Sequence, residues 1–212
     1  DNILEAPDDK DTVIVTPDNG GTLEGPRNDG SVRVPEDGAG TVTRPDPTDP
    51  NFPEGGKEDI RVPGGTVVDR DGTITLPDGT VIKPEDKIPD DVISQDYVIV
   101  TYDPNGGTGN TIRQMLKKGE ANQTLDGGVF TAPRGKTFEK WLDEANNKSY
   151  EANQELQLTG DLTLTAQWVN ETPTPTEYKA TVVFDPNTDE PTVTQTATHE
   201  GSAVFQAKLD AY

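Results

Sequence analysis

The sequence lacks cysteine entirely and has little aromatic content, with one histidine, two tryptophans and only 6% aromatic residues among 212. Without cysteine the chain has no disulfide, no thiol nucleophile and no thiolate metal site, and this absence favours an exported bacterial protein over a cytosolic one. Hydrophobic residues make up 30% of the chain, so we do not expect a single large core. No apolar run approaches the roughly 20 residues that span a bilayer.

Basic residues are also scarce, with 18 against 39 acidic ones and a formal charge of −21. Residues 1–96 hold 23 acidic and 9 basic residues, whereas residues 97–170 hold 9 and 7. Because an acidic chain repels phosphates and anionic lipids, we expect no nucleic-acid partner and no membrane insertion in this segment. The acidic start at Asp1 has no basic or apolar signal-peptide region. This fits a mature or trimmed exported fragment, and an intact cytosolic protein is the alternative.

Glycine and proline are abundant, at 21 and 18 residues, which favours turns and short strands. TVIVTPDNGGTLEGP (Thr12–Pro26) aligns without gaps on SVRVPEDGAGTVTRP (Ser31–Pro45). Each copy has an alternating strand, a turn rich in Asp, Asn and Gly, and a second short strand. That pattern predicts two β-hairpins.

A seven-residue spacing follows, with Gly-Thr pairs at Gly65-Thr66, Gly72-Thr73 and Gly79-Thr80. Prolines and glycines exclude a coiled coil, and the apolar residues between the pairs are mostly β-branched. The seven-residue spacing therefore predicts a small meander or a short solenoid. We expect residues 1–95 to be a thin or elongated acidic β-hairpin-rich region, partly ordered on a neighbour, with a flexible proline-rich leader as the alternative.

Residues 96–170 are the best candidate for a self-sufficient globular domain, because five aromatic residues follow between Gly107 and Val169: Phe130, Phe138, Trp141, Tyr150 and Trp168. DYVIVTYDPNGG (Asp96–Gly107) predicts an alternating strand that runs into a turn. LQLTGDLTLTAQWV (Leu156–Val169) predicts a hairpin around Gly160-Asp161. Thr111–Lys118 fits either a helix, capped by Asn110 and ended by Gly119, or a strand.

The last part of the chain contains a linker and a second strand-and-turn opening. ETPTPTE (Glu171–Glu177) is a stiff, extended Pro-Thr linker. YKATVVFDPNTDE (Tyr178–Glu190) repeats the strand and turn that open residues 96–170. We therefore divide the chain into residues 1–95, 96–170, 171–177 and 178–212.

Three motifs in residues 97–169 occur in a recognisable order: VIVTYDPNGGTGN, then TFEKW, then TGDLTLTAQW. Together they resemble one unit of the Listeria–Bacteroides repeat, the internalin-type B repeat of bacterial surface proteins. In the resemblance Asp103, Asn105, Gly106 and Gly107 form the first turn, and the remaining motifs supply Phe138, Trp141 and Trp168. The resemblance implies a small β-grasp-like fold within a mainly β chain, and it favours a strand at Thr111–Lys118.

Two departures from the family pattern bear on the fold. Tyr102 replaces the usual phenylalanine, and Lys140 replaces the glycine before the middle tryptophan, which allows a short helix at Phe138–Ala145. Residues 178–212 resemble the first half of a second copy. In that copy Asn187-Thr188-Asp189 replaces Asn-Gly-Gly, and the counterparts of the later aromatic residues are absent.

Candidate chemical groups in the sequence are few. His199 has only Ser202 nearby and no nucleophile-elbow context, so we expect a surface histidine. The acidic turns Asp69–Gly72 and Asp185–Glu190 do not meet the spacing of an EF-hand loop, and solvated turn residues are the expectation. The resemblance places Trp141 and Trp168 in the core rather than on a sugar-binding surface. We assign no catalytic, cofactor-binding or metal-binding residue, and expect no enzyme.

The sequence predicts a non-catalytic structural spacer in a bacterial cell-surface or secreted protein, a stalk associated with the cell wall that presents an adhesive region. The alternative is an adhesin module that binds a host or neighbouring surface protein or glycan through an exposed strand edge, in TYDPNGG or SAVFQAKL. A hydrolase with a carboxylate pair is a third class, and it would need a deep cleft with two acids of perturbed pKa.

Overall fold

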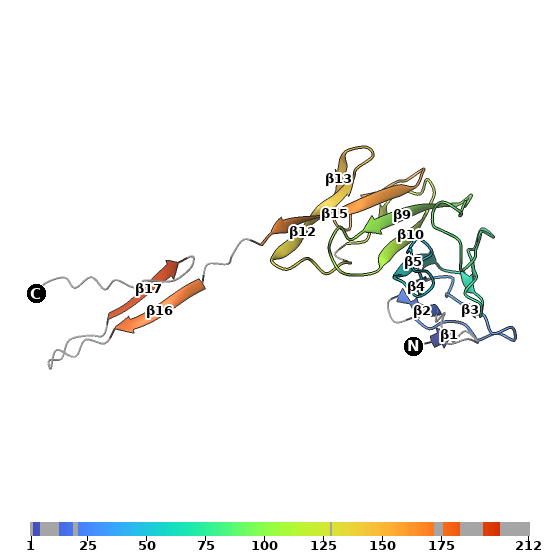
Figure 1. Ribbon diagram of the computed structural model, residues 1–212, viewed down its shortest axis with the longest axis horizontal. Coiled ribbons are helices and arrows are strands. Elements are labelled where there is room, and N and C mark those ends of the chain that lie inside the picture. The colour runs from blue at the N-terminus through green and yellow to red at the C-terminus, as the bar shows by residue number, and fades with distance from the viewer. Residues whose placement is uncertain are drawn as a thin grey trace, which may run out of the picture. The chain divides into compact units, whose positions relative to one another are not determined.

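The computed structural model describes residues 2–4, 13–18, 21–127, 129–171, 176–182 and 193–199. The chain divides into two compact units, Asp1–Val169 and Asn170–Tyr212 (Figure 1). The elements assigned in the described residues are almost all β-strands. The mainly β class predicted from the sequence is confirmed.

The first unit is built on a nine-stranded sheet in the order β1-β2-β4-β5-β10-β9-β15-β12-β13. Its strands are β1 (Asn2–Leu4), β2 (Val13–Pro17), β4 (Ala39–Pro45), β5 (Lys57–Pro63), β9 (Tyr97–Asp103), β10 (Thr111–Lys117), β12 (Lys136–Asp143), β13 (Lys148–Tyr150) and β15 (Leu162–Asn170). β5 and β10 pair in parallel. The sheet therefore continues across the predicted division between residues 95 and 96.

The segment with the seven-residue spacing contributes β6, β7 and β8 to a small second sheet in the order β3-β6-β7-β8. Its strands are β3 (Val32–Arg33), β6 (Val67–Val68), β7 (Ile74–Thr75) and β8 (Val81–Ile82). β6, β7 and β8 pair antiparallel in succession, which confirms the predicted meander.

The turns of the meander explain the recurring Gly-Thr pairs. Gly72 and Gly79 have positive φ values of 88° and 84°, a conformation that glycine adopts without steric cost. Asp71 Oδ1 accepts a hydrogen bond from the Thr73 N–H at 3.0 Å, and Asp78 Oδ1 accepts the equivalent bond from Thr80 at 2.9 Å. Each Asp-Gly-Thr therefore closes one tight turn.

The two hairpins predicted from the aligned copies are wrong. β2, from the first copy, pairs with β1 and with β4 of the second copy, while β3 pairs with β6. The local turns exist, but they redirect the chain between the two sheets. The expectation of a thin segment is wrong for its described residues, which bury a core of apolar side chains. The expected packing on a neighbour is confirmed, because Tyr97, Ile99 and Met115 join that core.

The strand order within residues 97–170 is that of a β-grasp sheet. β9 and β10 form an antiparallel hairpin, and β15 runs parallel to β9. β12 follows on the far side of β15, with β13 at the edge. Thr111–Lys117 is thus a strand, as the family resemblance favoured.

Two other local expectations for this region are wrong. The short helix at Phe138–Ala145 is instead β12, because Trp141 and Asp143 alternate toward the interior and β13 pairs with this stretch. The hairpin around Gly160-Asp161 does not form. β14 (Glu155–Leu156) pairs with β11 (Gln123–Thr124), whereas β15 joins the large sheet.

Strand β9 lies between two hydrophobic cores. Val100 and Tyr102 pack in the core of residues 97–170, and Tyr97 and Ile99 pack in the core of the N-terminal segment. Six of its seven residues are consequently buried. The strand predicted here is confirmed. Its apolar residues are typical of a strand covered on both faces, so residues 96–170 do not bury this strand alone.

The second unit is described by one antiparallel strand pair, β16 (Thr176–Val182) and β17 (Val193–His199). β16 overlaps the opening strand of the predicted second copy. Most of the remaining residues of that copy lie outside the described residues, and the copy stays a prediction.

Candidate functional site

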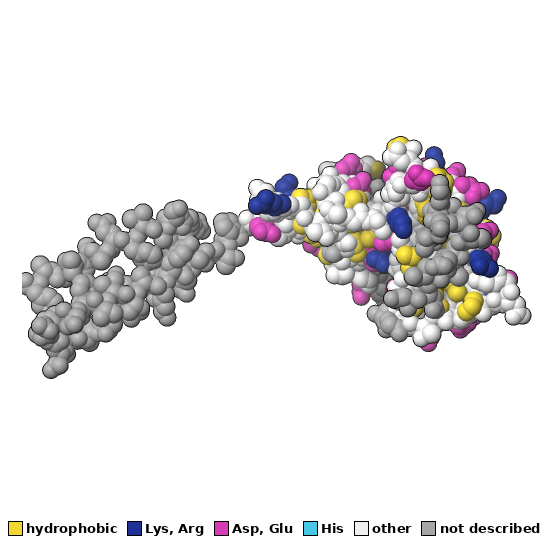
Figure 2. All heavy atoms as spheres, turned by 60° about the horizontal axis from the view of Figure 1, so that its bottom comes forward, with side chains coloured by type: hydrophobic (Ala, Val, Ile, Leu, Met, Phe, Trp, Pro, Cys, Tyr) yellow, Lys and Arg dark blue, Asp and Glu magenta, His cyan; other side chains and the backbone are white. Residues whose placement is uncertain are grey.

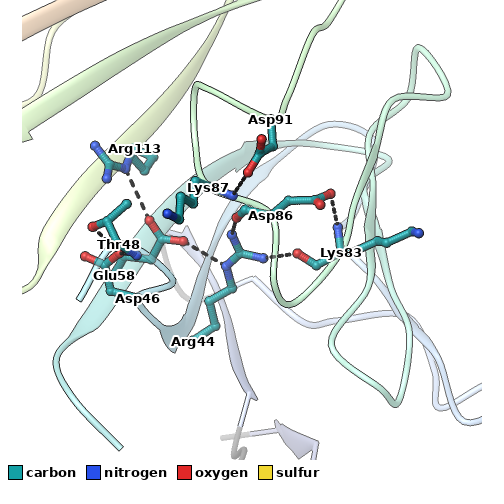
Figure 3. A network of polar contacts seen from close by, with 9 residues as sticks. All are labelled: Arg44, Asp46, Thr48, Glu58, Lys83, Asp86, Lys87, Asp91 and Arg113. Atoms are coloured by element: carbon teal, nitrogen blue, oxygen red, sulfur yellow. Dashed lines mark hydrogen bonds and ion pairs between the residues drawn. The ribbon is translucent and has the colours of Figure 1, made fainter. Parts of the chain in front are cut away.

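The most elaborate buried polar arrangement among the described residues is an ion triad of Arg44, Glu58 and Arg113 (Figure 3). Arg44 Nε lies 2.8 Å from Glu58 Oε1, and Arg113 Nε lies 3.2 Å from Glu58 Oε2. The Glu58 side chain has no exposed surface, and the two arginine side chains are 1% and 7% exposed. A charge so fully desolvated needs such partners to persist.

The two arginines connect Glu58 to two other parts of the first unit, the loop after β8 and strand β9. Arg44 donates from Nη1 to the carbonyl oxygen of Lys83 at 2.6 Å and from Nη2 to that of Asp86 at 2.7 Å, as Figure 3 shows. Arg113 donates to Thr101 Oγ1 at 3.0 Å. The triad thus ties β4, β5 and the loop after β8 to β9 and β10.

The chemistry of the triad suits a structural role. Burial raises the pKa of Glu58, while the charges of Arg44 and Arg113 act in the opposite direction. Both carboxylate oxygens are held by guanidinium groups, and the side chain is inaccessible to solvent. An external substrate has no access to it, so the group holds strands together rather than moving protons to a ligand.

A second set of contacts joins β5 to the repeat on the opposite face of the sheet. Arg61 Nε lies 3.0 Å from Asp126 Oδ2, and Asn110 Nδ2 donates to Asp59 Oδ1 at 3.1 Å. The Asp126 N–H in turn donates to the Tyr102 hydroxyl at 2.9 Å. Tyr102, where the family pattern has phenylalanine, thereby fixes the loop that receives Arg61.

The turn after β9 is bound to β15, the last strand of the first unit. The Trp168 indole donates from Nε1 to the carbonyl oxygens of Pro104 and Asn105 at 3.0 and 3.1 Å. Asn105 Nδ2 donates to the carbonyl oxygen of Ala166 at 2.8 Å. A Cβ on Gly107 would lie 2.6 Å from the Trp168 ring, so the Asn-Gly-Gly turn and the closing tryptophan form one packed corner.

Trp141 and Trp168 take different positions in the aromatic cluster. Trp141 is fully buried, and its ring centroid lies 4.9 Å from that of Tyr102 and 4.8 Å from that of Phe138. Trp168 is partly buried beside Phe138, at 5.8 Å. Trp141 is therefore a core residue, as the resemblance implied, and Trp168 packs at the margin of the same core.

The acidic turn Asp69–Gly72 closes the β6–β7 hairpin, with the Gly72 N–H donating to the Asp69 carbonyl at 3.0 Å. The second acidic turn, Asp185–Glu190, and Ser202 lie outside the described residues. His199 is described only as the last residue of β17, paired with Thr176.

The edge of TYDPNGG is not available for strand addition. It belongs to β9, which pairs with β10 on one side and β15 on the other. SAVFQAKL lies outside the described residues. Among the residues whose burial is described, the large exposed hydrophobic side chains come from four separate segments, Phe52, Val81, Ile93 and Val169. Figure 2 shows acidic side chains spread among small hydrophobic patches on the visible face.

Sequence reasoning did not find the ion triad. Arg44, Glu58 and Arg113 are far apart in the chain, and each stands in a strand where a charge is ordinarily solvated. One pattern was available: Glu58, Ile60 and Val62 alternate in β5, and the last two are apolar. That alternation places Glu58 on the core face.

Comparison with protein families identifies residues 99–167 as a Listeria-Bacteroides repeat domain. The resemblance predicted for residues 97–169 is confirmed over those residues. Searches of curated proteins and of solved structures found no match to the chain. Among the described residues, no helix has the length and apolar character needed to cross a membrane.

Proposed function

We propose that this chain is a non-catalytic spacer in a bacterial cell-surface or secreted protein and that it holds an adhesive region away from the cell wall. The family of the repeat at residues 99–167 is typical of extracellular or surface proteins of bacteria. The observation that carries the proposal is the continuity of the first unit. The N-terminal segment and the repeat share one sheet, and strand β9 is buried by both.

The strand order suits a chain under tension. β9 and β15 are the first and last strands of the repeat, and they pair in parallel from Leu162↔Val100 to Thr165↔Asp103. Pulling the two ends of the repeat apart slides these strands past each other, which stresses their row of hydrogen bonds together. Pulling β9 away from β10 at their common end instead breaks hydrogen bonds one after another.

This difference can be measured by single-molecule force spectroscopy, because the chain has no native cysteine to compete with engineered attachment points. The pair Gln95→Cys and Asn170→Cys applies shear between β9 and β15. The pair Gln95→Cys and Glu120→Cys peels β9 from β10 and is the matched control. We expect a clearly higher unfolding force in the shear pair, and equal forces would contradict the spacer proposal.

A binding module is the alternative function, and it makes a different prediction. An adhesin should bind host matrix proteins or surface glycans as the isolated chain, whereas a spacer should not. Small-angle X-ray scattering gives a second test, because a compact 212-residue protein has a radius of gyration of about 17 Å. A spacer should exceed this value clearly, and a value near it combined with ligand binding would favour the adhesin.

A further inference from the structure

The repeat has a second apolar surface, on the face of β9 and β10 that points away from its own core. Tyr97, Ile99 and Met115 lie there, 9%, 2% and 6% exposed, and all three belong to the core of the N-terminal segment. Without that segment these side chains would be exposed beside the unpaired edge of β10. Such an edge and face favour unwanted association.

The sequence of the second copy differs at these positions. When Asp185 is aligned with Asp103, Val182 and Phe184 replace Val100 and Tyr102, so the residues that face the repeat's own core stay apolar. At the positions that correspond to Tyr97 and Ile99, the aligned sequence has Lys179 and Thr181. The sequence of the second copy is therefore polar at two positions where the first copy is apolar and covered.

Strand β5 pairs with the edge of β10, and side chains on both faces of β5 form ion pairs with the repeat. In the parallel register Arg113 lies opposite Ile60, which sets Glu58 beside Arg113 on the buried face. On the other face the same register brings Arg61 to Asp126. A shift of one residue would exchange the two faces of β5 and separate both ion pairs.

We propose that residues 13–95 are an N-terminal cap dedicated to the first repeat. The cap covers the apolar back face of β9–β10 and fills the β10 edge, and it selects its partner and register through Glu58–Arg113 and Arg61–Asp126. It covers an edge and an apolar face of the repeat, as capping units do in repeat proteins. This inference stands apart from the spacer proposal, since an adhesin would need the same protection.

The test is charge reversal of the more accessible pair in the full chain. Arg61 and Asp126 have side chains 30% and 23% exposed, so Arg61→Asp and Asp126→Arg can be accommodated without a buried unpaired charge. The matched control is Arg33→Asp, because Arg33 is also 30% exposed and pairs with Glu36 inside the cap. Amide hydrogen exchange in β5 and β10 reports on the junction.

We expect each junction variant to speed exchange in β5 and β10 by about tenfold, and the double reversal Arg61→Asp with Asp126→Arg to restore most of the protection. Arg33→Asp should leave these amides at wild-type rates. Equal effects of Arg61→Asp and Arg33→Asp, or no rescue in the double variant, would overturn the proposal. If a reversal prevents folding, the cycle of Arg61→Ala and Asp126→Ala gives the same decision, and purely additive effects would count against recognition.

Discussion

Arg113 of the repeat lies 3.2 Å from the fully buried carboxylate of Glu58, a residue of the N-terminal segment 55 positions earlier in the chain. Because Arg44 occupies the other carboxylate oxygen, one negative charge compensates two buried guanidinium groups. The pairing makes the stability of the repeat depend on a segment outside its family boundaries. It also predicts how the first unit responds to mutation.

Replacement of Glu58 by glutamine should destabilise the first unit by about 3 kcal/mol, because the amide has only one acceptor oxygen and its NH2 group would face a guanidinium donor in the buried site. Urea unfolding followed by tryptophan fluorescence measures the change, and both tryptophans lie in the first unit. Glu139→Gln is the control, since Glu139 is 45% exposed and lies 3.8 Å from Lys140, and it should cost less than about 0.5 kcal/mol. A loss below about 1 kcal/mol for Glu58→Gln would show that the native side chain is already protonated.

The corner between the Asn-Gly-Gly turn and Trp168 makes a second prediction. Gly107→Ala should lower stability by about 2 kcal/mol, because its Cβ would lie 2.6 Å from the Trp168 ring and 3.0 Å from two backbone oxygens. Thermal unfolding measures the effect. Gly160→Ala is the control, as a Cβ there meets nothing within 4 Å. A Gly107→Ala protein as stable as the control would mean that Trp168 moves aside freely.

Local sequence patterns predicted the turns and the family motifs well, because these depend on a few adjacent residues. The Asp-Gly-Thr turns form where the seven-residue spacing predicts them. Asn105 and Gly107 form the turn after β9 through contacts with neighbouring residues and with β15. The mainly β class follows from the same evidence. Each of these features rests on backbone preferences that the sequence shows directly.

Strand partners were predicted poorly, since pairing is decided by contacts between distant segments. The turn after β2 resembles a hairpin turn, yet β2 gains more by pairing with β4 in the large sheet. The parallel pairing of β5 with β10 has no local pattern at all. Only the apolar run Tyr97–Val100 of β9 could have indicated that a second layer covers the repeat.

The two aspartates of the meander should differ in importance. Asp71 is exposed and bonds only within its own turn, whereas Asp78 Oδ2 also accepts bonds from Ser94 and Asp96 at 2.5 and 3.3 Å. We expect Asp78→Ala to cost about 1.5 kcal/mol and Asp71→Ala about 0.5 kcal/mol. Chemical denaturation of both variants checks this, and an equal cost would mean that the contact with the segment before β9 adds no stability.

Asp78 should also contribute to acid sensitivity. Burial alone would raise its pKa, but hydrogen bonds from Ser94, Thr80 and Asp96 outweigh this effect and hold the pKa below the usual 3.8. Below about pH 4 the unfolded chain therefore binds more protons at this site than the folded chain, so the free energy of unfolding falls as the pH falls. Glu58, whose pKa is raised, has the opposite sign: its contribution falls as the pH rises through its folded pKa.

Substitution of Asp78 by asparagine isolates the first of these effects. The free energy of unfolding of Asp78→Asn, measured in urea from pH 5 to pH 3, should fall less steeply than that of the wild-type chain. Some slope should remain, because backbone N–H groups of Ser31 and of Asn51 and Gly56 also lower the pKa values of Asp29 and Asp49. Parallel curves for the two proteins would show that Asp78 has the same proton affinity in the folded and unfolded chain, and that its hydrogen bonds to Ser94 and Asp96 do not favour the ionised form.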